Sequence, residues 1–134
     1  KPRPVVVEVR AVALLAASEG GRFLFCRRPP GGTLGGLDGV PLAEVAGDAL
    51  WDELDAAAAS LAAGFGLDAP LMAAGEARHS MSHRRYRVSG FAARVPDGWT
   101  PTVEGCGLRR PEAAALSRLD EKLLALAGWK RDRG

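Results

Sequence analysis

The hydrophobic and polar positions along the chain divide it into strands and helices separated by glycine- and proline-rich turns. Residues 5–17 are rich in Val, Ala and Leu, which predicts a mostly buried strand. Turn residues follow at 18–21, and residues 22–27 alternate enough to predict a second strand. The chain therefore opens with a hairpin-like pair of strands.

Two later segments carry the period of an α-helix. From Asp48 onward, acidic residues lie near the positive end of a predicted helix, and Gly66 provides a stop signal. Its apolar stripe consists of Leu50, Leu54, Ala57, Ala58, Leu61 and Phe65. A closing helix is predicted over residues 116–127, with an alternative start at Ser117. Its inward positions are Leu119, Leu123 and Leu126.

Between these helices the pattern returns to the period of a strand. A short strand is predicted around residues 72–76, and a half-buried strand over residues 85–92, where apolar or small residues alternate with polar ones. The sequence PDGWTP ends that strand. Strands alternating with one central and one terminal helix predict an α/β domain with helices packed on a mixed sheet.

Composition limits the class of protein. The chain of 134 residues, with 47% hydrophobic and 25% charged residues, fits one soluble globular domain. Its net charge of +2 is too small to indicate nucleic-acid binding, so the positions of the arginines matter more than their number. Cys26 and Cys106 belong to no CxxC motif and are predicted to be isolated thiols.

The beginning of the chain favours a cytoplasmic location and a linker. The apolar run at 11–17 is too short to cross a membrane, and no signal-peptide pattern precedes it. The first four residues, KPRP, cannot begin a helix and are predicted to be a linker stub of a longer polypeptide.

The segment ASLAAGFGL, residues 59–67, has the frame of the Nudix hydrolase box without its chemistry. That box ends in an Arg-Glu-aliphatic-x-Glu-Glu-x-Gly-aliphatic pattern. Leu61, Gly66 and Leu67 fill the apolar and glycine positions. The carboxylate positions are occupied by Ser60, Ala63 and Gly64. Magnesium, a hard cation, requires oxygen ligands that alanine and glycine side chains lack.

A second motif, RHSMSHRRYRV at residues 78–88, follows this frame. Together with RRPPGGTLGGLDGVP at residues 27–41, it resembles the C-terminal domain of A/G-specific adenine DNA glycosylases, the MutY family. The resemblance covers nearly the whole chain. It implies a Nudix-like α/β/α sandwich with a mixed sheet over residues 5–128, preceded by the linker at 1–4 and followed by a flexible tail at 129–134.

In function, the resemblance implies a domain that recognises 8-oxoguanine and has no catalytic residues or metal of its own. Excision of adenine, an N-glycosyl hydrolysis, belongs in that family to a helical N-terminal domain with an iron-sulfur cluster. The implied partners are double-stranded DNA with an 8-oxoguanine:adenine mismatch and the catalytic domain of the same chain. We expect a cytoplasmic monomer.

The resemblance also assigns the recognition residues. The family's Phe-Ser-His triplet falls on Met81, Ser82 and His83, and His79 takes the position of an upstream histidine. Met81 departs from the aromatic residue, and we expect it to act as an apolar wedge with less stacking. The glycine loop also departs, because residues 38–41 read Asp-Gly-Val-Pro where the family commonly has an aromatic residue and Phe-Pro.

Elementary chemistry supports this assignment. Oxidation converts N7 of guanine from an acceptor to an N–H donor and adds a carbonyl at C8, both on the edge that guanine in its normal orientation shows in the major groove. The Ser82 hydroxyl both donates and accepts, so it can sense that exchange. Nearby arginines are candidate phosphate contacts. They are Arg84, Arg85 and Arg87, with Arg28 as a fourth.

Other interpretations remain open from the residues alone. His79 and His83 lack a third ligand at local spacing, so they do not by themselves indicate zinc, and both would also suit the polar end of a strand. A free-standing Nudix-type nucleotide pyrophosphohydrolase would need carboxylates from elsewhere. The candidates are Glu44, Glu53 and Glu76. A third possibility is a degenerate Nudix module that binds a ligand or a protein.

Overall fold

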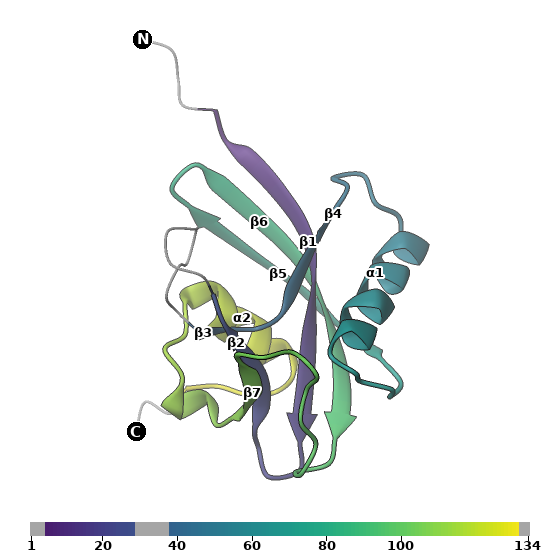
Figure 1. Ribbon diagram of the computed structural model, residues 1–134. Helices are drawn as coiled ribbons and strands as arrows, with labels where there is room; N and C mark the ends of the chain where they lie inside the picture. The colour runs from purple at the N-terminus through teal and green to yellow at the C-terminus, as the bar shows by residue number, and fades with distance from the viewer. Residues whose placement is uncertain (1–4, 29–37, 132–134) are drawn as a thin grey trace.

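The structure, a computed structural model, describes residues 5–28 and 38–131. In chain order its elements are β1 (Val7–Ser18), β2 (Phe23–Arg27), β3 (Asp38–Gly39), β4 (Leu42–Val45), α1 (Trp51–Gly64), β5 (Met72–Met81), β6 (Arg84–Val95), β7 (Cys106–Arg109), the 3₁₀ helix η1 (Pro111–Ala113) and α2 (Arg118–Leu126). The strands form a mixed sheet with α1 on one face and α2 on the other (Figure 1). The predicted fold class is confirmed.

Strand β1 lies at the centre of the sheet. All 12 of its residues pair in parallel with β6, from Val7 opposite Arg84 to Ser18 opposite Val95. Along its other edge, residues 10–13 pair antiparallel with β4. A strand covered on both faces requires a nearly continuous apolar run, which is what the sequence supplies over 9–16. Arg10 is the charged exception within this buried run.

Strand β2 pairs with β1, β3 and β7, and its pairing with β7 corrects the prediction made for the two cysteines. Cys26 lies opposite Gly39 of β3 on one side and opposite Cys106 of β7 on the other. Cys26 and Cys106 form a disulfide, so the prediction of isolated thiols is wrong. They are 80 residues apart in sequence. Only the pairing of β2 with β7 brings them together, and no local motif indicates that pairing.

Both predicted helices are present. Helix α1 packs on β1 and β4 through a buried stripe of Leu54, Ala58 and Ala62, and Gly66 follows its end with a φ of 74°. Leu50 was expected inside but is 71% exposed. It precedes the first helical turn in an extended conformation, so the helical period does not apply to it.

Helix α2 begins after Ser117, whose hydroxyl accepts a hydrogen bond from the backbone of Asp120. This is the later of the two predicted starting points. Leu119 and Leu123 are fully buried as predicted, and Leu126 is half-buried.

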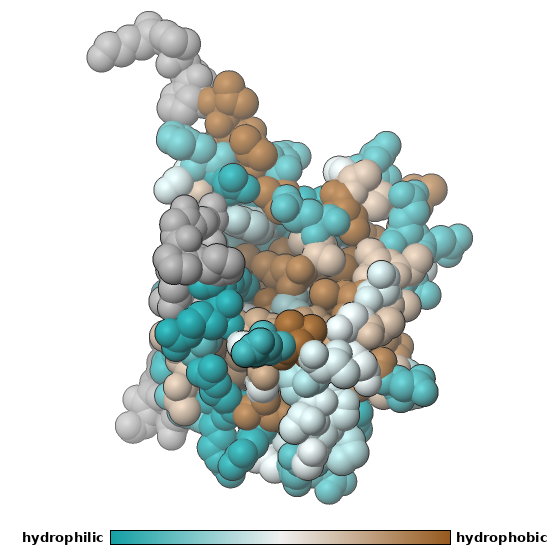
Figure 2. Space-filling model, in the orientation of Figure 1, coloured by the Kyte–Doolittle hydropathy of each residue, from teal (hydrophilic) through white to brown (hydrophobic). Residues whose placement is uncertain are grey.

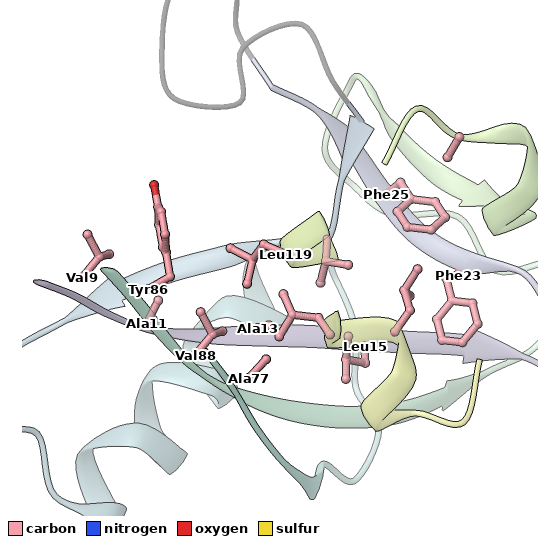
Figure 3. Close-up of a cluster of buried hydrophobic side chains, with 14 residues drawn as sticks. Val9, Ala11, Ala13, Leu15, Phe23, Phe25, Ala77, Tyr86, Val88 and Leu119 are labelled. Carbon is pink, nitrogen blue, oxygen red and sulfur yellow. The ribbon is translucent and has the colours of Figure 1, made fainter. Parts of the chain in front are cut away.

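The hydrophobic core has a layer on each face of β1. Odd-numbered residues such as Val9 and Ala13 lie in the cluster beneath α2, together with Val88 and Leu119 (Figure 3). Even-numbered Val12 lies in the cluster beneath α1. This alternation decides which face each functional side chain occupies.

Some expectations fall outside the described residues. These are the linker at 1–4, most of the glycine loop at 29–37, and the end of the tail at 132–134. At the start of the expected tail, Trp129 packs against the core and its indole N–H donates to Glu112 (3.1 Å). No helix in the described ranges is long and apolar enough to cross a membrane.

Candidate nucleic-acid interface

The two motif residues Ser82 and His83 form the turn of a long hairpin. Strands β5 and β6 pair antiparallel up to Met81 opposite Arg84, so the turn between them contains only these two residues. Both are exposed. Strand β5 is longer than predicted, because its pairing with β6 carries it through His79 to Met81.

The backbone of this turn is fixed at both residues. Ser82 has a φ of 49°, a left-handed conformation that costs a residue with a Cβ about 1–2 kcal/mol. The carbonyl of His83 accepts a hydrogen bond from the Val7 backbone (2.7 Å), which joins the turn to the start of β1. The hairpin thus presents Ser82 and His83 at one end of the molecule, beside the beginning of β1 (Figure 1).

The surroundings of the tip combine charge with apolar surface. Hydrophilic side chains cover much of this end of the molecule, and apolar side chains at the start of β1 lie among them (Figure 2). Those apolar residues are Val5, Val6 and Val7, exposed by 80%, 44% and 49%. Such a mixture is compatible with a surface that contacts both the charged backbone and the bases of DNA.

His79 is held by a residue from α2. The ammonium of Lys122 lies 3.1 Å from His79 Nδ1 and also donates to the Arg78 carbonyl (2.9 Å). Burial lowers the pKa of His79, and the charges of Lys122 and Arg118 lower it further. Because an ammonium can only donate, we infer that Nδ1 accepts and that the neutral ring carries its hydrogen on Nε2. His79 is therefore a hydrogen-bond donor near neutral pH.

The side chain of Met81 is less exposed than its predicted role as an apolar wedge would require. It is half-buried and packs against the core cluster that includes Val9 and Tyr86. Its side chain contributes to the α2-facing layer, so the insertion expected of it at a base step would require it to leave that contact. The wedge role stays a prediction.

The arginines of the motif occupy both faces of the hairpin. Arg84 and Arg85 are adjacent on β6 and so point to opposite faces. Arg85 faces Glu8 at 4.0 Å, and Arg87 donates to Glu76 at 2.6 Å. All three arginines are exposed enough to reach a phosphate.

Arg28 has a different role from the one expected. Its guanidinium donates to both carboxylate oxygens of Asp120 (3.0 and 3.2 Å) and to the Val40 carbonyl. Asp120 has no solvent exposure and also accepts from the Ser117 hydroxyl (2.7 Å). Arg28 therefore anchors α2 through Asp120, and this pairing occupies the guanidinium that was expected to contact phosphate.

Comparison with solved structures identifies the architecture. The mouse MUTYH C-terminal domain, solved in complex with human PCNA, matches with a TM-score of 0.68 at 18% identity, over 90% of this chain and 87% of that one. The MutT protein of Methanosarcina mazei matches at 0.66 and 16% identity, over 92% and 95%. This chain has a Nudix-like fold. At these identities the match establishes the fold and nothing finer.

Other Nudix-like folds match equally well. The NUDIX domain of Shewanella oneidensis NrtR, solved with ADP ribose, gives a TM-score of 0.68 at 12% identity, over 96% of this chain and 91% of that one. No sequence-family model and no curated protein sequence matches the chain.

The positions that hold carboxylates in the Nudix hydrolase box lie on α1 in this structure. Ser60, Ala63 and Gly64 are exposed in the last turns of α1, where they offer a hydroxyl but no carboxylate. Two of the alternative carboxylates have partners within the fold, since Glu53 accepts from the Leu50 backbone and Glu76 from two arginines. Across residues 5–28 and 38–131, no three His, Cys, Asp or Glu side chains gather as a metal site would require.

Sequence reasoning missed several residues of this interface. Lys122 lies 43 residues from His79, so no local pattern could connect them. Arg10 carried a usable signal, because a charged residue in a buried strand requires a partner, and Glu76 lies 3.9 Å from it.

Proposed function

We propose that this chain is the 8-oxoguanine-recognition domain of an A/G-specific adenine DNA glycosylase, non-catalytic by itself. The observation that carries the proposal is the exposed two-residue turn formed by Ser82 and His83. These are the residues that match the MutY recognition triplet, and the fold matches that of a MUTYH C-terminal domain. The fold match supports the proposal without establishing it.

The turn has the geometry needed to test one base edge. A narrow tip can enter the major groove, where the Ser82 hydroxyl can accept from N7–H of 8-oxoguanine or donate to its C8 carbonyl. Unmodified guanine has an acceptor at N7 and no C8 carbonyl, so one group would remain unpaired. That penalty is about 1–3 kcal/mol, or roughly 5- to 150-fold in affinity.

The neighbouring residues support this role. Neutral His79 would donate through Nε2, and His83 would contact phosphate or orient Ser82. Excision would belong to a helical domain elsewhere in the parent chain, which would hold the iron-sulfur cluster. We place this activity in the cytoplasm as part of the same proposal.

The test is a low-salt titration against two duplexes that differ only in 8-oxoguanine or guanine opposite adenine. We expect tighter binding of the oxidised duplex, and a loss of that preference in Ser82→Ala and His83→Ala. Ser60→Ala is the matched control, because it removes an exposed hydroxyl at the end of α1. Equal binding of both duplexes by the unaltered domain would refute the proposal.

The hydrolase alternative makes a separate prediction. The chain shares its fold with MutT proteins, so magnesium-dependent release of pyrophosphate from nucleoside triphosphates would indicate an enzyme. Loss of that release in Glu53→Gln or Glu44→Gln would identify the carboxylates involved. A ligand-binding module would bind a nucleotide without hydrolysing it and would ignore both duplexes.

A further inference from the structure

Four arginines converge on the face of the hairpin and of β1 that points toward α1. In the strand register, Arg10 lies opposite Arg87, and Arg87 lies opposite Arg78. Two residues further toward the tip, Arg85 lies between Glu8 and Ser80. Directly opposed residues of paired strands project to the same face, so three strands contribute to one cluster.

These side chains line a pocket of about 250 Å³. Gly47, just before α1, also borders it. Arg10 is only 7% exposed, while Arg78, Arg85 and Arg87 are exposed by 73%, 62% and 53%. The lining thus combines one buried arginine with three exposed ones, and Ser80 belongs to it as well.

The charges in this pocket do not balance. Glu76 is shared by Arg87 (2.6 Å), Arg78 (3.1 Å) and Arg10 (3.9 Å), and among residues 5–28 and 38–131 Glu8 pairs with Arg85 alone, at 4.0 Å. Four positive charges therefore face two negative ones. The pKa of Arg10 is lowered mainly by burial and then by the nearby Arg87 charge, with Glu76 opposing, which agrees with a positive local field.

We propose that this pocket binds a phosphate group of the DNA backbone, so that one strand passes along the α1-facing side of the hairpin. Guanidinium groups present forked donors that match phosphate oxygens. The pocket is close to the tip, since Ser80 precedes Ser82 by two residues, about 7 Å of strand. The inference rests on the proposed function for the identity of the molecule that carries the phosphate.

Substitution of Glu76 can distinguish phosphate binding by these arginines from a purely structural ion-pair network. If the arginines serve only to pair with Glu76, Glu76→Gln should weaken the fold and leave DNA binding unchanged or weaker. If they bind phosphate, Glu76 competes with that phosphate. Its replacement by Gln should then tighten DNA binding by roughly 2- to 5-fold.

The experiment measures dissociation constants for the guanine and 8-oxoguanine duplexes over a range of salt concentrations. We expect Arg78→Gln and Arg87→Gln each to weaken binding of both duplexes by roughly 5-fold, because each removes one exposed charge-assisted hydrogen bond. The ratio of the two constants should not change. The salt slope of log K should become shallower by about 0.9 for each phosphate that the variant no longer neutralises.

Two controls accompany these variants. Arg94→Gln removes an exposed arginine near the far end of β6 and should change affinity by less than the other two. Inorganic phosphate, titrated in the absence of DNA and followed by arginine side-chain NMR signals, should shift Arg10 and Arg87 but not Arg94. Thermal unfolding verifies that each variant is folded.

The two proposals can fail separately. Unchanged affinity of Arg78→Gln and Arg87→Gln for both duplexes, or unchanged or weaker binding by a folded Glu76→Gln, would overturn the phosphate pocket. If the unaltered domain shows no preference for 8-oxoguanine while the arginine variants still lose affinity, the reader function fails and the pocket stands.

Discussion

Two groups of polar residues, each containing a serine, contrast in this protein. At the start of α2, Asp120 is fully buried and joins Arg28 to Ser117 through hydrogen bonds of 2.7–3.2 Å. At the hairpin tip, Ser82 and His83 are exposed and project from the sheet. A serine therefore stabilises the fold in one place and, in our proposal, reads a base in the other. The two roles differ because of how deeply each side chain is buried and which groups it contacts, and residue type alone does not reveal them.

Among the tests of this comparison, substitution of Asp120 should have the largest effect, and that effect should be on stability. Asp120→Ala leaves the guanidinium of Arg28 without its partner in a site where it is 16% exposed. Breaking a buried pair in this way should lower the free energy of unfolding by about 3–5 kcal/mol, measured by urea denaturation. Asp55→Ala, an exposed position on α1, should change it by less than about 0.5 kcal/mol.

Lesion preference should be unaffected in the folded fraction of Asp120→Ala. A selective loss of 8-oxoguanine preference in that variant, with unchanged stability, would reverse the roles assigned to the two groups.

Two substitutions of Ser82 should have a smaller effect, and together they distinguish backbone strain from base recognition at the hairpin tip. Glycine adopts the left-handed backbone of position 82 without the penalty of a Cβ, but it loses more entropy on folding. Ser82→Gly should therefore be more stable than Ser82→Ala by roughly 0.5–1 kcal/mol, measured by denaturation. Both variants lack the hydroxyl, so both should lose preference for 8-oxoguanine. Retained preference in either one would show that the backbone, and not the hydroxyl, reads the base.

The smallest effect concerns the charge of His79. Lys122→Met removes the ammonium from Nδ1, so the pKa of His79 should rise toward its ordinary value. NMR titration of the imidazole protons measures this, and His83→Gln assigns the signal because the chain has 2 histidines. Lys122→Arg keeps the charge and should keep the pKa low. Identical titration of His79 in all three proteins would show that the charge of Lys122 does not contribute to the lowered pKa, which would leave burial and Arg118 as its causes.

The same shift has a consequence for stability. Because the pKa of His79 is lower in the folded state, the unfolded chain binds the proton more tightly. Its contribution to stability is therefore complete above the ordinary histidine pKa and falls as the pH drops through the folded value. In Lys122→Met this decrease on acidification should be smaller.

Both helices and the strands β1, β2, β5 and β6 were predictable because their signals are local, whereas the short strands β3, β4 and β7 and the 3₁₀ helix η1 were not predicted. Leu54 and Ala58 repeat along one side of α1, and Leu119 and Leu123 along one side of α2, so a short window reveals each helix. The two-residue turn was less visible, since Ser80, Ser82 and His83 are polar on both faces and give no alternation. The family resemblance, and not periodicity, indicated which of these residues belong to the candidate site.

The contacts that define the candidate site depend on pairing at long range. Arg10 meets Arg87 because β1 and β6 run in parallel, 77 residues apart, and Lys122 meets His79 because α2 packs on β5. Sequence patterns specify which residues prefer burial, but they do not specify which strands become neighbours. Arg28 shows the same limit, because its partner Asp120 is 92 positions away.

The bond between Cys26 and Cys106 also determines how the molecule responds to cleavage. It closes a covalent ring that contains β3 to β6 and α1, and it leaves β1 and α2 on arms outside that ring. A protease that cuts once at any point between the two cysteines opens the ring without dividing the chain. Such a nicked protein would migrate as one molecule on a non-reducing gel and as two fragments after reduction.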